Sequence, residues 1–195
     1  PRPAAGEPLY IQTHGWSSYK VRLDGYDSSA GYAAQALAAQ GIAVVQLGFY
    51  PIDNVGDDPH GEAPKNAQMF EYVVSHLQKE GLIDANNVAL QAFSRSGTGV
   101  NYALAFGKLR YKAAVIADAM EAGYWQFLAT QSSGPGKGFQ DWMRRLNGGA
   151  PGDPPGKWID QTPQFHANNY TAPVLELRFG ELIIGWESYA ALRAA

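Results

Sequence analysis

The chain has 195 residues, of which 46% are apolar and 17% are charged, and its formal net charge is −3. This composition is too apolar for an intrinsically disordered chain, and the slightly acidic balance argues against a nucleic-acid-binding surface. Because the sequence contains no cysteine, disulfide scaffolds, thiol nucleophiles and cysteine-built zinc sites are excluded. No apolar run approaches the roughly 18 residues of a membrane-spanning helix, so we expect no membrane span, and the composition leaves the compartment open.

Five short apolar runs have the composition of strands that are buried on both faces of a parallel sheet. In chain order they are residues 9–13, 42–47, 88–93, 113–117 and 173–178.

Segments with helical periodicity lie between these runs. They are residues 28–40, 67–81 and 97–106, and another helix begins at residues 186–193. The alternation predicts an α/β fold with a mostly parallel sheet and helices on both faces. In such a sheet, binding residues are expected at the carboxyl ends of the strands.

Residues 132–157 differ from the rest because glycine and proline are dense there. We expect a loop-rich excursion with a short amphipathic helix around residues 139–146, within a single domain that spans residues 1–195. The chain opens without Met and ends just after an apolar periodic run, so we expect both ends to be cut and the domain to be truncated at its C-terminus.

Residues 87–100 carry the clearest chemical signal. A buried strand runs into Ser94, and a helix is expected directly after it. This is the context of a nucleophile elbow, in which a serine sits on a sharp turn with its Oγ raised above the sheet. Crowding there favours small residues two positions before and after the serine, and Ala92 and Ser96 meet this need although a strict G-x-S-x-G is absent. The helix N-terminus would point at the site, with the N–H of Arg95 as one oxyanion donor.

Ser94 also fits the N-cap of the following helix, which is a common role for a serine after a buried strand. Ser96 is a competing cap or nucleophile, although a position two residues further on is less exposed. The local pattern therefore leaves both interpretations of Ser94 open.

The stretch NVALQAFSRSG at residues 87–97 resembles the nucleophile region of the prolyl oligopeptidase family of serine peptidases, within the α/β-hydrolase superfamily. The helix from Tyr72 and the sequence GLID at residues 81–84 are similar to the family's lead-in to that strand. A bacterial subgroup that includes lasso-peptide isopeptidases is similar in three further stretches: residues 116–118, 123–126 and 147–151.

The resemblance extends from Leu9 to Leu192 and implies an α/β-hydrolase fold, peptidase activity and a peptide substrate. It also implies a β-propeller before this domain in the full-length protein, since family members usually carry one. It places the second oxyanion donor near THGW at residues 13–16. Many members use a tyrosine side chain there, whereas this sequence offers Thr13 or His14, or a backbone N–H of Gly15 or Trp16.

A glycine turn that simply ends a strand explains the same residues equally well. Because no partner stands at ligand spacing from His14, we expect no metal there, and we expect no cofactor.

A catalytic triad of this order needs an acid after the strand at residues 173–178, followed by a histidine. The family's usual aspartate is missing, and the sequence offers Glu181 or Glu187 instead. We favour Glu187, because it opens a helix and the subgroup resemblance points there. Asp118, at the end of the fourth strand, is an alternative acid or a cap for the segment that follows. Each glutamate also fits an ordinary carboxylate near a helix start.

The histidine is the gap in this site. The chain has His14, His60, His76 and His166, and all four precede Glu187. His76 sits inside a helical segment, and His166 is expected in a loop rather than as a displaced base. We therefore expect the base beyond Ala195.

The sequence predicts a serine-type peptidase that hydrolyses peptide or isopeptide bonds through an acyl-enzyme, in a fragment that lacks the triad histidine. A carboxylesterase or lipase-like hydrolase is the alternative enzyme. A hydrolase-like binding module without catalysis is the non-enzymatic alternative, supported by the irregular elbow. Tyr124, Trp125 and Phe127 form either an apolar substrate wall or part of the core.

Overall fold

The computed structural model describes residues 6–14, 32, 34–48, 61–133, 137–152, 156–178 and 186–195. In these ranges five parallel strands form one sheet with the order β2-β1-β3-β4-β5. The strands are β1 (Glu7–Thr13), β2 (Ala43–Leu47), β3 (Ile83–Phe93), β4 (Ala113–Ala117) and β5 (Val174–Leu177). All five predicted strands are therefore present, and their parallel pairing brings the carboxyl ends of β1, β3, β4 and β5 to one edge of the sheet.

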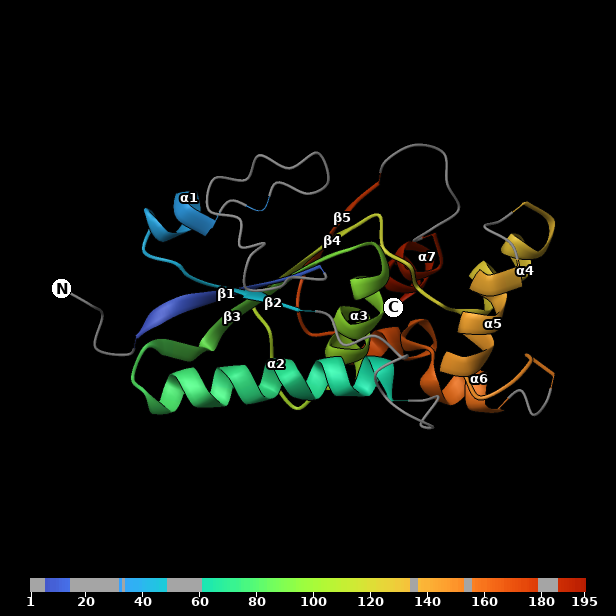
Figure 1. Cartoon of the computed structure of the whole chain (residues 1–195), viewed down its shortest axis with the longest axis horizontal. Helices are drawn as coiled ribbons and strands as arrows, with labels where there is room; N and C mark the ends of the chain where they lie inside the picture. The colour runs from blue at the N-terminus through green and yellow to red at the C-terminus, as the bar shows by residue number, and fades with distance from the viewer. Residues whose placement is uncertain are drawn as a thin grey trace.

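Helices cover both faces of this sheet, as predicted, with α1 on one side and α2 and α3 on the other (Figure 1). The described helices are α1 (Ala34–Ala38), α2 (Glu62–Lys79), α3 (Gly97–Phe106), α4 (Tyr124–Ser133), α5 (Lys137–Leu146), α6 (Gly156–Gln161) and α7 (Trp186–Ala194). Two 3₁₀ segments, η2 (Ser94–Ser96) and η3 (Pro163–Asn169), complete the described elements.

The helix α2 begins at Glu62, five residues before the predicted start. Pro64 lies in its first turn, where a backbone N–H has no partner within the helix and proline is therefore tolerated. The strand β3 also begins earlier than predicted, because Ile83 pairs with Glu7 at the start of β1.

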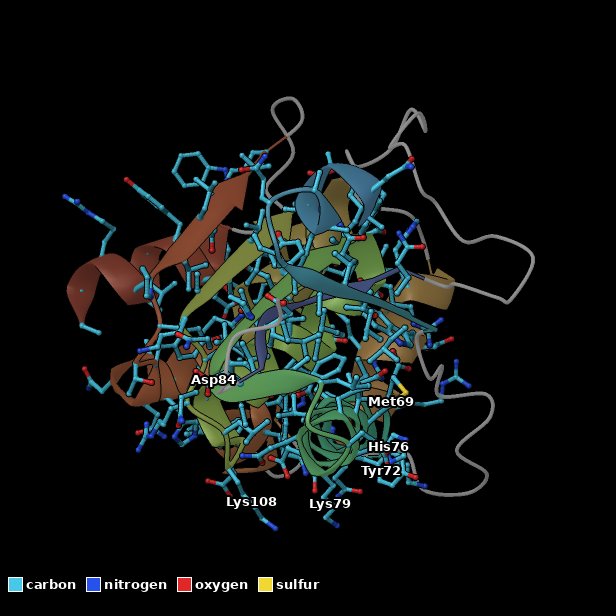
Figure 2. The ribbon with its side chains drawn as sticks, turned by 90° about the vertical axis from the view of Figure 1, so that its left-hand side faces the viewer. Met69, Tyr72, His76, Lys79, Asp84 and Lys108 are labelled. Carbon is cyan, nitrogen blue, oxygen red and sulfur yellow. The ribbon has the colours of Figure 1, made fainter. Side chains whose placement is uncertain are left out.

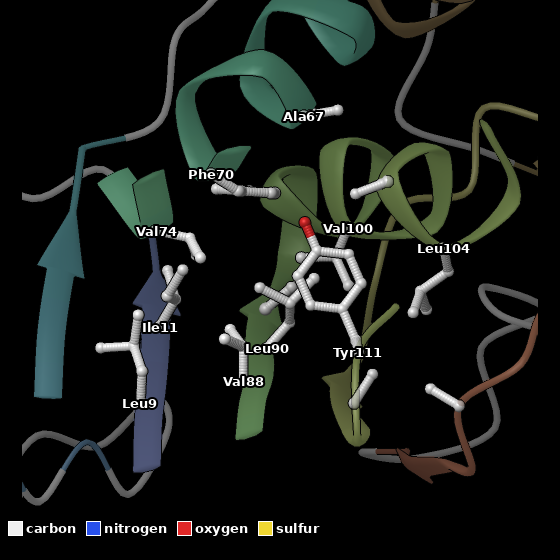
Figure 3. Packing of buried hydrophobic residues seen from close by; sticks show 14 of the residues in the cluster. Leu9, Ile11, Ala67, Phe70, Val74, Val88, Leu90, Val100, Leu104 and Tyr111 are labelled. Atoms are coloured by element: carbon white, nitrogen blue, oxygen red, sulfur yellow. The ribbon is translucent and has the colours of Figure 1, made fainter. Parts of the chain in front are cut away.

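The main core lies between the sheet and the pair α2 and α3. Leu9 and Ile11 on β1 align with Val88 and Leu90 on β3, and all four side chains are buried under Phe70 of α2 (Figure 3). Because side chains alternate across a strand, the even-numbered residues of β1 point to the other face.

On that other face, three glutamines from neighbouring strands form a ladder of side-chain hydrogen bonds, in which Gln12 and Gln91 are buried and Gln46 is half-buried. The Nε2 of Gln46 donates to the Oε1 of Gln12 at 2.9 Å, and the Nε2 of Gln12 donates to the Oε1 of Gln91 at 2.9 Å. The register pairs Gln12 with both of the others, so parallel pairing itself sets these bonds.

A second cluster of buried side chains is formed by the part of the sequence that connects β4 to β5, chiefly by α4, α5 and α6. Phe127, Trp142 and Trp158 are its large members, and the rings of Phe127 and Trp158 meet edge to face at 5.2 Å. The sequence predicted α5, which falls in the glycine- and proline-rich excursion, but it did not predict α4 or α6. The three helices lie together at the end of the molecule away from α1 (Figure 1).

Candidate active site

Ser94 occupies the turn between β3 and α3. Phe93 before it is extended, with φ −134° and ψ 141°, whereas Ser94 itself has a φ of 55°. The left-handed region costs an L-residue roughly 1–2 kcal/mol, so the surrounding contacts must hold this turn. The half-buried Ser94 thus stands at the carboxyl end of β3, in the strained strand-to-helix turn expected of a nucleophile elbow.

Ser96 ties this turn to the end of β1. Its Oγ lies 2.7 Å from the carbonyl oxygen of Thr13 and 2.8 Å from that of Phe93, and it accepts the N–H of Phe93 at 3.2 Å. Its one proton is donated to one of the two carbonyls at a time. Because the Ser96 side chain is buried and used in this way, it has a structural role at the elbow.

The segment after β4 packs directly on the turn. The N–H of Met120 donates to the carbonyl oxygen of Ser94 at 2.9 Å. A Cβ at Gly97 would lie 2.2 Å from the Cβ of Ala119, so the first residue of α3 has no room for a side chain. Ala92 on β3 is fully buried, which agrees with the small residues predicted around the elbow.

The side chain of Arg95 is held by two residues that the sequence analysis did not single out. Its Nε and Nη2 donate to the Oε1 and Oε2 of Glu62 at 2.9 and 2.6 Å. The guanidinium carbon stands 5.1 Å from the ring centroid of Trp142, whose Nε1 donates to Glu62 Oε2 at 3.3 Å. The local sequence signal for Glu62 is weak: it is an acidic residue directly after Gly61, where the first turn of a helix favours negative charge.

The end of β1 lies beside the elbow. Thr13 is fully buried, and its Oγ1 has no hydrogen-bond partner within the described residues. The ring of His14 meets that of Phe93 edge to face at 4.8 Å and lies parallel to that of Tyr32 at 6.3 Å. Gly15 and Trp16, the two predicted backbone donors of the oxyanion hole, lie outside the described residues.

Glu187 lies at the start of α7, and its carboxylate reaches the N-terminus of α4. Its Oε2 accepts the N–H groups of Trp125 and Gln126 at 3.1 and 3.3 Å. A Cβ at Gly123 would lie 2.3 Å from the same oxygen, so glycine leaves the space that the carboxylate fills. Burial raises the pKa of Glu187, and the backbone N–H groups of α4 oppose that rise.

Glu121 makes the reverse connection, from the segment before α4 to the start of α7. Its two carboxylate oxygens accept the N–H groups of Glu187 and Ser188 at 3.1 and 2.8 Å. Burial raises the pKa of Glu121 to about 7, with smaller contributions from nearby Glu187 and Glu176. The two helices are therefore capped reciprocally by Glu121 and Glu187.

Of the other two candidate acids, Asp118 and Glu181, the structure describes Asp118. Asp118 directly follows β4 with a φ of 45°, and its N–H donates to the carbonyl oxygen of Leu177 at 2.7 Å. It thus stands at the same sheet edge as Ser94. Glu181 lies outside the described residues.

Two histidines have partners away from the elbow. His76 stands on the exposed face of α2, with its ring parallel to that of Tyr72 at 6.2 Å (Figure 2). The Nε2 of His166 lies 3.0 Å from the carbonyl oxygen of Ile159, and its ring packs on that of Phe106. His60 lies outside the described residues.

Two exposed tryptophans line a groove at the junction of α4 and α7. Trp125 is 55% exposed and Trp186 is 53% exposed, and with Glu187 and Ala190 they border an open volume of about 540 Å³. Phe127, by contrast, belongs to the second core. A cavity of about 600 Å³ lies elsewhere, between η3, β5 and α7, and it does not include the elbow.

Within the described ranges, no group of three or more histidine, aspartate or glutamate side chains is placed to hold a metal ion. No helix in the same ranges combines the length and the apolar character needed to cross a bilayer.

The sequence matches no family model and no curated protein, whereas the fold is similar to several solved structures. A puromycin-hydrolyzing peptidase of Mycobacterium tuberculosis aligns with 97% of the chain at a TM-score of 0.72 and 17% identity. The AtxE2 isopeptidase, solved with astexin3-dC4 bound, aligns with 97% at a TM-score of 0.70 and 20% identity. Esterase B of Lactobacillus rhamnosis aligns with 99% at a TM-score of 0.63 and 15% identity.

These similarities establish the α/β-hydrolase fold and confirm the predicted fold class. The two peptidases are of the prolyl oligopeptidase family, so the chain has the fold of that family's catalytic domains. The chain spans 28% and 30% of the length of these two structures and 63% of that of the esterase.

Proposed function

We propose that this chain carries the catalytic serine of a serine-type hydrolase that cleaves peptide or isopeptide bonds through an acyl-enzyme. The observation that carries the proposal is the left-handed φ of 55° at Ser94, at the end of the central strand β3. An N-cap serine has no need of that strain, because a cap typically takes extended backbone angles. A turn that raises Oγ above the sheet and exposes it to substrate does need it.

In the proposed reaction, Ser94 Oγ attacks the carbonyl carbon of the scissile bond while a histidine accepts its proton. The N–H of Arg95 and that of Gly15 or Trp16 stabilise the oxyanion of the tetrahedral intermediate. The amine leaves with the proton from the histidine, and water then hydrolyses the acyl-serine by the same steps.

The histidine is proposed to come from outside these 195 residues. This is supported by the positions of His76 and His166, whose rings pack on Tyr72 and Phe106 away from the elbow.

A glutamate is proposed to orient this histidine, with Glu187 and Glu181 as the two candidates. Glu187 stands at the start of α7, but one of its oxygens is already used by two N–H groups of α4. Because these bonds compete with a histidine for the Glu187 carboxylate, Glu181 should be tested together with Glu187. Asp118 stays a third candidate because of its position at the same sheet edge.

A fluorophosphonate probe applied to the full-length protein tests the proposal. We expect a covalent adduct on Ser94, detected by mass spectrometry of the digested protein, and no adduct in Ser94→Ala. Adduct formation in Glu187→Gln and Glu181→Gln then shows which acid is needed. A folded wild-type protein that does not react, or a Ser94→Ala variant that still does, would contradict the proposal.

A carboxylesterase is the second candidate, favoured by the likeness to esterase B, of which the chain covers 63%. Both enzymes would react with the probe. Turnover of p-nitrophenyl acyl esters without cleavage of any peptide substrate would favour the esterase.

A further inference from the structure

Three elements converge on the residue that follows the proposed nucleophile. Arg95 comes from η2, Glu62 from the first turn of α2 and Trp142 from α5. Arg95 lies 33 residues after Glu62 in the chain, and Trp142 lies 80 residues after it. Their contact is therefore a product of the fold and not of local sequence.

Glu62 is 0% exposed, and the Arg95 side chain is 33% exposed. The carboxylate faces the guanidinium with both of its oxygens, at 2.9 and 2.6 Å. A planar fork of two parallel bonds restricts the guanidinium to one plane and one direction. The ring of Trp142 lies against the same guanidinium at 5.1 Å and adds a cation–π contact.

The backbone of Arg95 is held as well. Its carbonyl oxygen accepts the Oγ1 of Thr98 at 3.0 Å, and its N–H belongs to the peptide that follows the strained Ser94. With the side chain and the carbonyl both fixed, the direction of that N–H has little freedom.

We propose that Glu62 and Trp142 are positioning residues that act through the Arg95 side chain to aim the Arg95 N–H at the oxyanion. This inference rests on the proposed function, because it assigns a supporting role to residues around the same serine. A buried ion pair is by itself weak evidence for a stabilising role, since desolvation opposes the attraction. We assign the Glu62–Arg95 pair a role in orienting the Arg95 N–H because the pair stands directly beside the proposed nucleophile Ser94.

The consequence for catalysis follows from how sharply an oxyanion donor depends on direction. Complete removal of one donor lowers the rate about 10²–10³-fold in enzymes of this type. A misdirected donor loses part of that effect, and a displacement of ~1 Å is enough to matter. Glu62→Gln keeps the shape of the side chain but removes the charge and one of the two acceptor oxygens.

The test measures the second-order rate of fluorophosphonate labelling at Ser94 in the full-length protein. We expect Glu62→Gln to lower this rate about 10-fold or more, below the loss for complete donor removal. On a p-nitrophenyl ester, kcat should fall while KM stays unchanged, because substrate binding is not affected. Glu71→Gln is the matched control, because it is the same substitution on the same helix. Among the described residues, Glu71 accepts the N–H of Lys108 in an exposed position, and its substitution should leave the rate unchanged.

A double-mutant cycle with Arg95→Met separates positioning from general stabilisation. If Glu62 acts through the Arg95 side chain, Glu62→Gln has no further effect on the labelling rate once Arg95 is methionine. Independent losses that multiply in the double variant would overturn the inference. So would a folded Glu62→Gln variant that labels at the wild-type rate.

Circular dichroism and the thermal midpoint establish that each variant is folded. If Glu62→Gln does not fold, Trp142→Leu decides, since it removes one hydrogen bond and the cation–π contact, and we expect a loss of about three- to tenfold in rate. An unchanged rate in Trp142→Leu would then overturn the inference. A wild-type protein that does not label at all contradicts the proposed function instead, so the two failures are distinguishable.

Discussion

Ser94 stands in a backbone conformation that costs a serine free energy, and the residues around it show how that conformation is kept. Ser94 has a φ of 55°; the N–H of Met120 donates to its carbonyl oxygen, and the N–H of the neighbouring Phe93 donates to the Oγ of Ser96. The hydroxyl of Ser96 also reaches Thr13 at the end of β1. This one buried side chain therefore fixes the distance between the elbow and the strand end where the second oxyanion donor is proposed.

Replacing Ser96 with alanine tests this role. The variant removes the hydroxyl that accepts the N–H of Phe93 and bonds the carbonyl oxygen of Thr13, so we expect the free energy of unfolding to fall by about 1–3 kcal/mol. Thr98→Val is the matched control, because within the described part of the chain its hydroxyl bonds the nearby Arg95 carbonyl alone, and its loss should cost less. Urea denaturation measures both, and equal losses in the two variants would contradict the assignment.

At the scale of secondary structure, the glutamine ladder shows how the sheet specifies its own register. Gln12 is fully buried and bonds to a glutamine on each side. A shift of one residue in either strand pair would turn Gln12 to the opposite face from its partners and leave its amide unsatisfied. The ladder thus opposes wrong pairings of β1 with β2 and β3.

Gln12→Leu should be costly for the same reason. The substitution conserves much of the side-chain volume but removes both ladder bonds, and we expect a loss of about 2–4 kcal/mol in the free energy of unfolding. Gln46→Leu, at the half-buried end of the ladder, breaks one of these bonds and should cost less. The check is urea unfolding of both variants, and a Gln12→Leu protein as stable as Gln46→Leu would show that the ladder is not a unit.

The elements that could be predicted from the sequence are those whose signal is local. The five strands and α3 follow from short apolar runs and from the strand-to-helix pattern around Ser94. The first turn of α2 was missed because Pro64 looks like a helix breaker, although the first turn tolerates it. The helix α4 was missed because Gly123 and the aromatic residues after it give no clear helical stripe.

The site divides in the same way. The serine and the small residues around it are close in sequence, so their arrangement could be predicted. The pairing of Arg95 with Glu62 and the contact of Glu187 with the N-terminus of α4 depend on segments 33 and 62 residues apart. No local pattern encodes such pairings, because each depends on where whole elements pack.

At the scale of the whole molecule, α4 and α7 are joined by the reciprocal caps of Glu121 and Glu187. The carboxylate of Glu187, on α7, accepts N–H groups at the start of α4, and the carboxylate of Glu121, before α4, accepts N–H groups at the start of α7. The exchange connects the second core, which α4 helps to build, to the helix that follows β5. Glu121 is buried, so ionising its carboxylate costs desolvation free energy even though both oxygens accept hydrogen bonds.

This cost gives the protein a stability that depends on pH. Burial raises the pKa of Glu121 to about 7 in the folded state, against the ordinary glutamate value of 4.5. Between these two values the folded protein binds more protons than the unfolded chain, so the free energy of unfolding falls as pH rises. At 1.36 kcal/mol for each pKa unit, Glu121 should contribute a loss of about 3 kcal/mol between pH 4.5 and pH 8. The raised pKa of Glu187 acts in the same direction.

Glu121→Gln isolates this contribution, because an amide has no proton to gain in this range. The variant should be less stable than the wild type near pH 5, because its amide nitrogen cannot accept one of the two N–H groups that the Glu121 oxygens bond. Above pH 7 the difference should shrink or reverse, since only the wild type then buries a charge. Urea unfolding of both proteins at pH 5 and pH 8 measures the effect. Two pH profiles that run parallel would show that Glu121 does not change its protonation on unfolding, and the reciprocal caps would then hold the helices together without coupling them to pH.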